Sequence, residues 1–287
     1  MDAPPPIALV TGASGFIAGH IIEQLLSRGY SVRATVRYLA DESSYKHLKT
    51  LSNAEEDLAF VEADLVKPEG WSAALEGNVR FVFLCAGPFI LKNSENAQCD
   101  LYEPFVDGTR TILELCEKLP SVKKVVLTSC FAALSDEFNE NTHDETNWNA
   151  TSTLERNPYH YCKTEQEKLA WEFAKRPQCH YKLVTILPGV VLGPHLNPDR
   201  ISQSHKFLLA FISKRRIPNL SFCISDVRDV ANAHILALEN PDADGRYVFS
   251  SVSDSPSVSL SLSLSVSLLS SSSFTPSFVF SLRVFTS

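Results

Sequence analysis

A tyrosine and a lysine four residues apart, Tyr159 and Lys163, have the spacing that proton transfer needs. On a helix, residues four apart lie on one face, so the lysine ammonium would lie beside the phenol. A neighbouring positive charge favours the phenolate and lowers the tyrosine pKa from its usual value of about 10. We therefore expect Tyr159 to donate and accept a proton near neutral pH. Tyr45 and Lys49 have the same spacing without any other sign of a site, so the spacing alone is weak.

A glycine-rich loop, TGASGFIA, runs from Thr11 to Ala18. Gly12 permits a tight turn, Gly15 lets backbone N–H groups approach a pyrophosphate, and the small Ala18 lets a helix pack closely on a strand. The positive end of a helix dipole at this point also favours an anion. Glycines serve ordinary turns too, so the position of the loop between a strand and a helix is what favours nucleotide binding. The nucleotide-binding candidates in the loop are Gly12, Ser14, Gly15, Phe16 and Ile17.

Two arginines, Arg33 and Arg37, lie about 20 residues beyond this loop. An acidic residue at this distance would bind the ribose 2′-hydroxyl of NAD, whereas a guanidinium can bind the 2′-phosphate of NADP. We therefore predict NADP(H) rather than NAD(H) as the cofactor. Both arginines could instead be solvated charges at the end of a strand. Loop residues after the next two apolar runs lie where the adenine and ribose would bind, and these are Asp64, Leu65, Ala86, Gly87 and Pro88.

The elements that must position these residues alternate along the chain. Short apolar runs predict buried strands at 7–10, 31–36, 58–61, 81–85, 125–127 and 183–187. Helices are predicted at 16–26, 99–119, 160–174 and 226–238. This alternation predicts an α/β fold with a Rossmann-like, doubly wound parallel sheet and right-handed crossovers. Such sheets bind ligands beyond the carboxyl ends of their strands, which is where the candidate residues fall.

The composition narrows the classes of partner. A net charge of −7 and a pI of about 5.6 provide no basic surface for nucleic acid or for an anionic membrane. The absence of a signal-like start and of a run of about 18 apolar residues argues against secretion and membrane spanning. Seven cysteines are widely spread without a C-x-x-C pair, which argues against a zinc site and a disulfide framework. We therefore expect reduced thiols in a soluble cytoplasmic protein without a bound metal.

Several motifs together resemble those of the extended short-chain dehydrogenase/reductases. They are TGASGFIAGH, VRATVR, ADL, VVLTSC, YHYCKTEQEKLAWEFA, LPGVVLGP and DVRDVANAHILALEN, and they cover roughly residues 6–250. The order of these motifs is more specific than any one of them. Within this family, which is part of the NAD-dependent epimerase/dehydratase superfamily, the chain resembles the group of dihydroflavonol reductases, cinnamoyl-CoA reductases and yeast NADPH-dependent methylglyoxal reductase.

The resemblance implies roles for residues of the predicted site. In this family a tyrosine protonates the substrate carbonyl oxygen while the nicotinamide delivers hydride. A lysine binds the nicotinamide ribose and lowers the tyrosine pKa. Tyr159 and Lys163 match these two residues. Pro188 and Gly189 match a segment that closes over the nicotinamide, and Arg37 matches the residue that binds the 2′-phosphate.

The residue that steadies the substrate carbonyl is where this sequence departs from the family. The family usually has T-S-S at the end of the fifth strand and uses the second serine, but this chain has Cys130 there. A thiol is a weak hydrogen-bond donor, so we expect weaker support of the carbonyl. Side chains alternate along a strand, so Thr128 shares a face with Cys130 and is the easier substitute, whereas Ser129 points away. Cys130 could instead be a reactive nucleophile or a small packing residue.

The C-terminal part of the chain differs from the rest. Serine dominates from residue 251 onward, and residues 257–267 alternate serine with apolar residues as a strand does, without turns or long side chains that would let them join a core. In the family this part builds helices of a substrate lobe, so we expect a small, truncated lobe in which the tail replaces them. The rival interpretation is a true low-complexity tail that favours aggregation. The predicted division is an NADP-binding domain over 1–195 plus 224–240, a partial substrate lobe over 196–223 plus 241–250, and the Ser-rich tail over 251–287.

These observations predict an NADPH-dependent reductase that transfers hydride to the carbonyl of a small or aromatic aldehyde or ketone. The resemblance implies dihydroflavonol-, cinnamoyl- or methylglyoxal-like substrates, with Tyr159 as the proton donor. Two alternatives stay open. A nucleotide-sugar epimerase or dehydratase shares the fold and the tyrosine–lysine pair, and a catalytically weak NADP-binding regulatory module would account for Cys130. The segment 99–119 resembles a dimer surface of the superfamily, so we also consider a homodimer.

Overall fold

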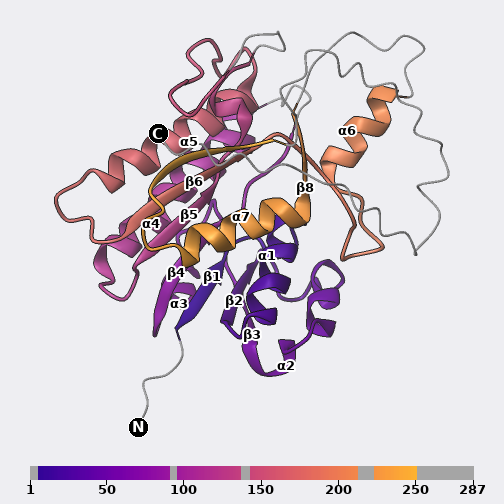
Figure 1. The fold of residues 1–287 in the computed structure, drawn as a ribbon, viewed down its shortest axis with the longest axis vertical. Coiled ribbons are helices and arrows are strands. Elements are labelled where there is room, and N and C mark those ends of the chain that lie inside the picture. Colours follow the sequence, from indigo (N-terminus) through magenta and orange to yellow (C-terminus); the bar gives the residue numbers. More distant parts are fainter. Residues whose placement is uncertain (1–5, 91–95, 137–142, 213–222, 251–287) are drawn as a thin grey trace.

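The computed structural model describes residues 6–90, 96–136, 143–212 and 223–250 (Figure 1). The Ser-rich tail over 251–287 lies outside these residues, so the two interpretations of the tail stay predictions. The division into a cofactor-binding domain and a substrate lobe also stays a prediction, apart from one strand that is considered below.

A parallel sheet with the strand order β3-β2-β1-β4-β5-β6-β9 forms the centre of the fold (Figure 1). Its strands are β1 (Ile7–Val10), β2 (Ser31–Val36), β3 (Leu58–Glu62), β4 (Val79–Leu84), β5 (Lys124–Thr128), β6 (Lys182–Pro188) and β9 (Gly245–Phe249). The order reverses on either side of β1, and ligands of doubly wound sheets bind at this switch point. The predicted Rossmann-like α/β fold is confirmed.

Helices cover both faces of this sheet (Figure 1). One face carries α1 (Phe16–Ser27) and α7 (Val227–Glu239), and the other carries α3 (Trp71–Leu75), α4 (Gly108–Lys118) and α5 (Pro158–Ala174). The shorter elements are η1 (Glu42–Ser44), η2 (Lys46–Thr50), α2 (Ala54–Asp57), η4 (Phe131–Ala133), β7 (Val190–Leu192), α6 (Gln203–Ile212) and β8 (Ile224–Asp226). β7 and β8 pair in parallel as a small second sheet.

The two apolar cores follow from the alternation of side chains along the strands. Val126 of β5 belongs to the core beneath α1 and α7, whereas its neighbours Val125 and Leu127 belong to the core beneath α3, α4 and α5. All five residues of β5 are buried. A central strand that is covered on both faces therefore reads as a continuous apolar run, as the sequence predicts.

The predicted single helix over 99–119 is two elements in the structure. The segment η3 (Gln98–Asp107) has wide π-type turns, and the regular helix α4 starts at Gly108. Pro104 lies inside η3, and a proline lacks the N–H and sterically clashes with the preceding turn of a regular α-helix. A side chain at Gly108 would lie 2.8 Å from the carbonyl oxygen of Leu65, so glycine allows the close approach of these segments.

The last described strand corrects the predicted domain boundary. Residues 241–250 are predicted to belong to the substrate lobe, but β9 is the outermost strand of the central sheet beside β6. The two strands run parallel, with Val184 opposite Gly245 and Pro188 opposite Phe249. Pairing with β9 satisfies backbone groups along an edge of β6 that would otherwise be open. The boundary at residue 240 is therefore wrong for this strand.

A buried carboxylate ties the last three strands to α5. Glu167 of α5 has no exposed surface and, besides Trp171 Nε1 of its own helix at 3.4 Å, accepts hydrogen bonds from three residues of the sheet. These are Ser129 Oγ at 2.7 Å, Thr185 Oγ1 at 2.7 Å and Arg246 Nε at 2.8 Å. The partners belong to the end of β5, to β6 and to β9, so the strand order beside α5 depends on one charged group.

Arg246 extends this connection to the loop before α5. Its Nη1 atom donates to the carbonyl oxygens of Glu145 at 2.7 Å and Asn147 at 2.6 Å. Its guanidinium also lies 3.7 Å from the centre of the Trp148 ring. The buried ion pair therefore has hydrogen-bond partners on both sides, which is the condition for tolerating two charges in the interior.

We expect Glu167→Ala to lower the free energy of unfolding by about 3–5 kcal/mol, because it leaves the buried charge of Arg246 without its partner. Urea unfolding followed by circular dichroism measures this change. The control is Glu42→Ala, which removes the exposed pair with Lys49 at 3.0 Å and should cost less than about 1 kcal/mol. Equal losses for the two variants would contradict a central role for the buried pair.

Candidate active site

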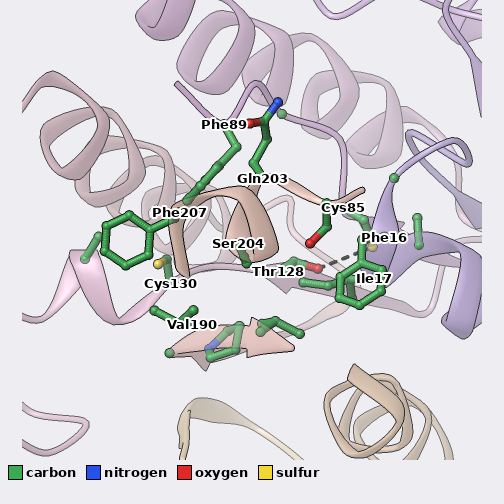
Figure 2. Close-up of a pocket in the computed structure, with 18 of the residues that line it drawn as sticks. Phe16, Ile17, Cys85, Phe89, Thr128, Cys130, Val190, Gln203, Ser204 and Phe207 are labelled. Carbon is green, nitrogen blue, oxygen red and sulfur yellow. Dashed lines mark hydrogen bonds between the residues drawn. The ribbon is translucent and has the colours of Figure 1, made fainter. Parts of the chain in front are cut away.

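A cavity of about 810 Å³ opens at the carboxyl ends of the central strands (Figure 2). Its wall contains the predicted catalytic residues Thr128, Ser129, Cys130, Tyr159 and Lys163. It also contains the predicted cofactor-binding residues Ser14, Gly15, Phe16, Ile17, Gly87, Pro88, Pro188 and Gly189. Figure 2 shows Phe16 and Ile17 at one side of the cavity and Cys130 at the other. The fold thus brings the two groups of candidates into one space.

The other predicted cofactor-binding residues are not part of this wall, and they are Gly12, Arg37, Asp64, Leu65 and Ala86. Two of them have evident uses in the fold. The carbonyl oxygen of Asp64 accepts a hydrogen bond from Trp71 Nε1 at 2.9 Å, and Leu65 packs against Gly108. Their predicted contacts with adenine or ribose stay predictions.

The glycine loop has the geometry of an anion cradle. Gly12 has a positive φ of 70°, and a Cβ there would lie 2.9 Å from Cα of Ala86, so the ends of β1 and β4 approach closely only because Gly12 has no side chain. Gly15 caps α1 without any side-chain hydrogen bond to the first turn. Among the described residues no side chain caps the first turn of α1, so its N–H groups can bind a ligand, and the loop fits the pyrophosphate of a dinucleotide.

The two arginines after the loop have different positions. Arg33 Nη1 donates to the carbonyl oxygens of Ala74 at 3.0 Å and Glu76 at 2.6 Å, at the end of α3. It therefore satisfies backbone acceptors that a helix terminus leaves without partners. Arg37 is exposed just beyond the end of β2. Of the pair, Arg37 is the exposed residue, and its contact with the 2′-phosphate stays a prediction.

The tyrosine and the lysine lie on α5, as predicted. Pro158 occupies the first turn of this helix, so Tyr159 lies at its start and Lys163 one turn later. Lys163 is buried, and its Nζ donates to the carbonyl oxygen of Thr128 at 2.8 Å and to Gln166 Oε1 at 2.6 Å. Burial lowers the pKa of Lys163 to about 8.

The predicted lowering of the pKa of Tyr159 is wrong as a net result, because burial outweighs any effect of the Lys163 ammonium. Burial, followed by the neighbouring Cys130, raises the pKa of Tyr159 well above its usual value of 10.0. The loss of hydration disfavours the phenolate, while the ammonium of Lys163 is directed at Thr128 and Gln166. Tyr159 is therefore a protonated phenol at neutral pH.

The strand end confirms that Thr128 and Ser129 point to opposite faces. Thr128 Oγ1 lies 2.8 Å from His234 Nε2 on α7, and Ser129 Oγ donates to Glu167 on α5. His234 Nδ1 lies 2.7 Å from the carbonyl oxygen of Val230, which can only accept, so Nδ1 carries the proton. Burial lowers the pKa of His234 to about 4, so Nε2 is the acceptor for the Thr128 hydroxyl.

This arrangement corrects the prediction that Thr128 is the easier substitute for the missing serine. Its hydroxyl proton is engaged by His234, and the hydroxyl of Ser129 is engaged by Glu167. Cys130 lies beside Tyr159, and each of the two side chains affects the pKa of the other. Burial raises the pKa of Cys130, so the group is a thiol and not the thiolate that a nucleophile requires.

Several residues of the site are absent from the sequence prediction. The rings of Phe89 and Phe105 meet Tyr159 edge to face at centroid distances of 5.0 Å and 5.9 Å. Phe207 of α6 also contributes to the wall (Figure 2). In the sequence these phenylalanines are apolar residues of a loop or a helix, and nothing distinguishes them from core residues. Glu167 is a charged residue at a buried helical position, and this mismatch is the signal that could have found it.

The structure also tests three predictions about the described residues, which concern metal binding, the state of the cysteines and membrane-spanning helices. Among these residues, no group of three or more His, Cys, Asp or Glu side chains is placed to hold a metal ion. The seven cysteines are free thiols. None of the helices that the structure describes has both the length and the apolar character needed to cross a membrane.

Two plant reductases are among the known proteins with similar sequences. Cinnamoyl-CoA reductase CAD2 of Medicago truncatula is 37% identical over 247 residues, which are 84% of this chain and 74% of that protein. Tetraketide alpha-pyrone reductase 1 of Arabidopsis thaliana is 35% identical over 258 residues, which are 88% of this chain and 78% of that protein.

A solved structure confirms the fold. Gre2 of Candida albicans in complex with NADPH is 32% identical, with a TM-score of 0.75 over 86% of this chain and 78% of that one. The family model for NAD dependent epimerase/dehydratases matches residues 8–249. Together with the glycine loop, the strand-end cavity and the tyrosine and lysine of α5, this match shows that the chain belongs to the NAD-dependent epimerase/dehydratase family.

Proposed function

We propose that this chain is an NADPH-dependent reductase that acts on the carbonyl group of a small or aromatic aldehyde or ketone. The observation that carries the proposal is a single cavity whose wall contains both the bare glycine loop and the protonated Tyr159. The names of the similar proteins support it, since they are reductases of cinnamoyl-CoA and tetraketide pyrones. The NADPH in the similar Candida structure supports the choice of cofactor.

Separate parts of the site would hold the cofactor. The N–H groups around Gly15 would bind the pyrophosphate, Arg37 the 2′-phosphate, and Pro188 and Gly189 would cover the nicotinamide. A side chain at Gly189 would collide with the carbonyl oxygen of Cys223, so this segment packs closely on its neighbour. NADPH, when bound, supplies the hydride for carbonyl reduction.

Tyr159 acts as the general acid. Its raised pKa keeps the phenol protonated at neutral pH, so its hydroxyl can donate a proton to the carbonyl oxygen as negative charge develops there. Lys163 places a positive charge at the same end of the cavity, which stabilises the phenolate that remains after the transfer. The Cys130 thiol contributes a weaker hydrogen bond than the family serine would.

The substrate end of the cavity is apolar. Phe89 and Phe105 lie against Tyr159, and Phe131 and Phe207 also contribute to the wall. Aromatic side chains pack well against aromatic ligands in offset or edge-to-face arrangements. This lining favours a carbonyl compound with an aromatic or other apolar group over a nucleotide-sugar, whose hydroxyl groups need polar partners.

We expect Tyr159→Phe to lower kcat/KM by at least about 100-fold, because the general acid is lost. A panel of aldehydes and ketones, followed by NADPH absorbance, measures the rate, and fluorescence titration checks that NADPH still binds. The matched control is Tyr45→Phe, since Tyr45 has the same spacing from Lys49 and donates instead to the carbonyl oxygen of Leu39 at 2.7 Å. If Tyr159→Phe is as active as wild type, Tyr159 is not the proton donor.

Cys130→Ser should raise kcat about 2- to 10-fold, because a hydroxyl is the better donor and such a bond contributes about 0.5–1.5 kcal/mol. Steady-state kinetics measures the change, and Cys99→Ser, at an exposed cysteine, should have no effect. NADPH binding without any carbonyl-dependent oxidation in either Cys130 form would favour the regulatory module over the reductase.

The rate should fall above about pH 8, because Lys163 has its pKa lowered to about 8 and loses its charge as the pH rises through that value. Below pH 8 the ammonium is present and supports the phenolate. The profile of kcat/KM between pH 6 and about 10 should show this fall as a descending limb at high pH. Lys163→Met should be slow throughout and lack the limb, so a limb of the same shape in that variant would assign it to another group.

A further inference from the structure

The segment 193–202, between β7 and α6, lies over the first turns of α1. His20 Nε2 of α1 lies 3.0 Å from the carbonyl oxygen of Pro194. A Cβ at Gly19 would lie 3.5 Å from Leu196 and 3.6 Å from Leu48, so these two leucines pack at the same point of α1. The segment 193–202 therefore meets the residues that follow β2, close to the predicted position of the cofactor.

Asn197 in this segment has an unused buried donor. The residue is only 8% exposed, contributes to the cavity wall, and accepts a hydrogen bond from the Asp199 N–H at 3.0 Å. Its Nδ2 atom has no hydrogen-bond partner among the described residues. A buried amide without a partner is costly and rare in folded proteins, so this donor indicates a ligand.

His47 presents a second donor or acceptor without a partner. It lies in η2 after β2 and contributes to the same cavity wall. Its Nδ1 atom is buried and, within the described chain, makes no hydrogen bond. Burial, followed by the guanidinium of Arg200, lowers the pKa of His47, and both residues contribute to the same cavity wall.

Arg200 adds a positive charge at this point. It contributes to the cavity wall, and its Nη2 lies 3.6 Å from Oδ2 of Asp41, with both side chains 48% exposed. Asp41 follows Arg37 by four residues, in the stretch after β2 where dinucleotide-binding folds contact the ribose 2′ position. An exposed ion pair is weak, so an incoming dianion can compete for the guanidinium.

We propose that Asn197, Arg200 and His47 form a second anchor for the 2′-phosphate of NADPH, in addition to Arg37. A phosphate monoester carries up to two charges and accepts several hydrogen bonds, which suits a guanidinium, an amide N–H and an imidazole. The anchor rests on the proposed function, because it requires NADPH as the cofactor. It makes the segment 193–202 a determinant of the preference for NADPH over NADH.

The test is equilibrium binding of NADPH and NADH to the full chain, by calorimetry or quenching of protein fluorescence. We expect Arg200→Gln to raise the Kd for NADPH about tenfold and the Kd for NADH less than about twofold, because only NADPH carries the 2′-phosphate. Asn197→Ala should act in the same direction by about threefold. The control Arg80→Gln changes an exposed arginine at the amino end of β4 and should leave both constants unchanged.

Arg200→Gln could weaken NADPH binding either because a contact with the phosphate is lost or because the charge of Asp41 is no longer neutralised. A double variant distinguishes the two causes. Under the proposal, Asp41→Asn binds NADPH at least as tightly as wild type, while Asp41→Asn with Arg200→Gln stays weaker than wild type. Full recovery in the double variant, equal losses for NADPH and NADH, or no loss in Arg200→Gln would each overturn the anchor and leave the reductase proposal standing. If wild type binds neither coenzyme, both proposals fail.

Discussion

The buried carboxylate of Glu167 is the interaction on which the arrangement of the site depends. A charge without exposed surface must have partners, and the sheet supplies Ser129 after β5, Thr185 in β6 and Arg246 in β9. Because Glu167 lies one turn beyond Lys163 on α5, the helix that carries Tyr159 and Lys163 is attached to the sheet at this point. The position of Tyr159 relative to the end of β5 follows from that attachment.

The same constraint decides which strand-end side chain is available to a substrate. Glu167 engages Ser129 from the α5 face, and His234 engages Thr128 from the α7 face. The hydroxyls of both residues therefore serve the fold, and Cys130 is the residue that reaches Tyr159. A chain with two hydroxyls next to its site thus uses a thiol there, because buried polar groups elsewhere need those hydroxyls.

Protonation in the site follows from burial more than from charge pairing. Burial favours the neutral form of every group, so it raises the pKa values of Tyr159 and Cys130 and lowers those of Lys163 and His234. A protonated phenol suits the reduction of a carbonyl, in which the enzyme must donate a proton. The apolar lining of the cavity and the raised pKa of Tyr159, the proposed general acid, therefore have one physical origin.

The sequence by itself determined the first six strands of the sheet, the helices α1, α5 and α7, the glycine loop and the place of Tyr159 and Lys163, because hydrophobic period and turn chemistry are local properties. Alternation along β5 also predicted the opposite directions of Thr128 and Ser129. Only the tertiary structure decided which partners these side chains meet, that β9 completes the sheet, and that burial raises the pKa of Tyr159. These outcomes depend on contacts between residues that are far apart in the chain, and no local sequence pattern predicts such contacts. The whole fold sets the packing and the hydrogen-bond partners of buried polar groups.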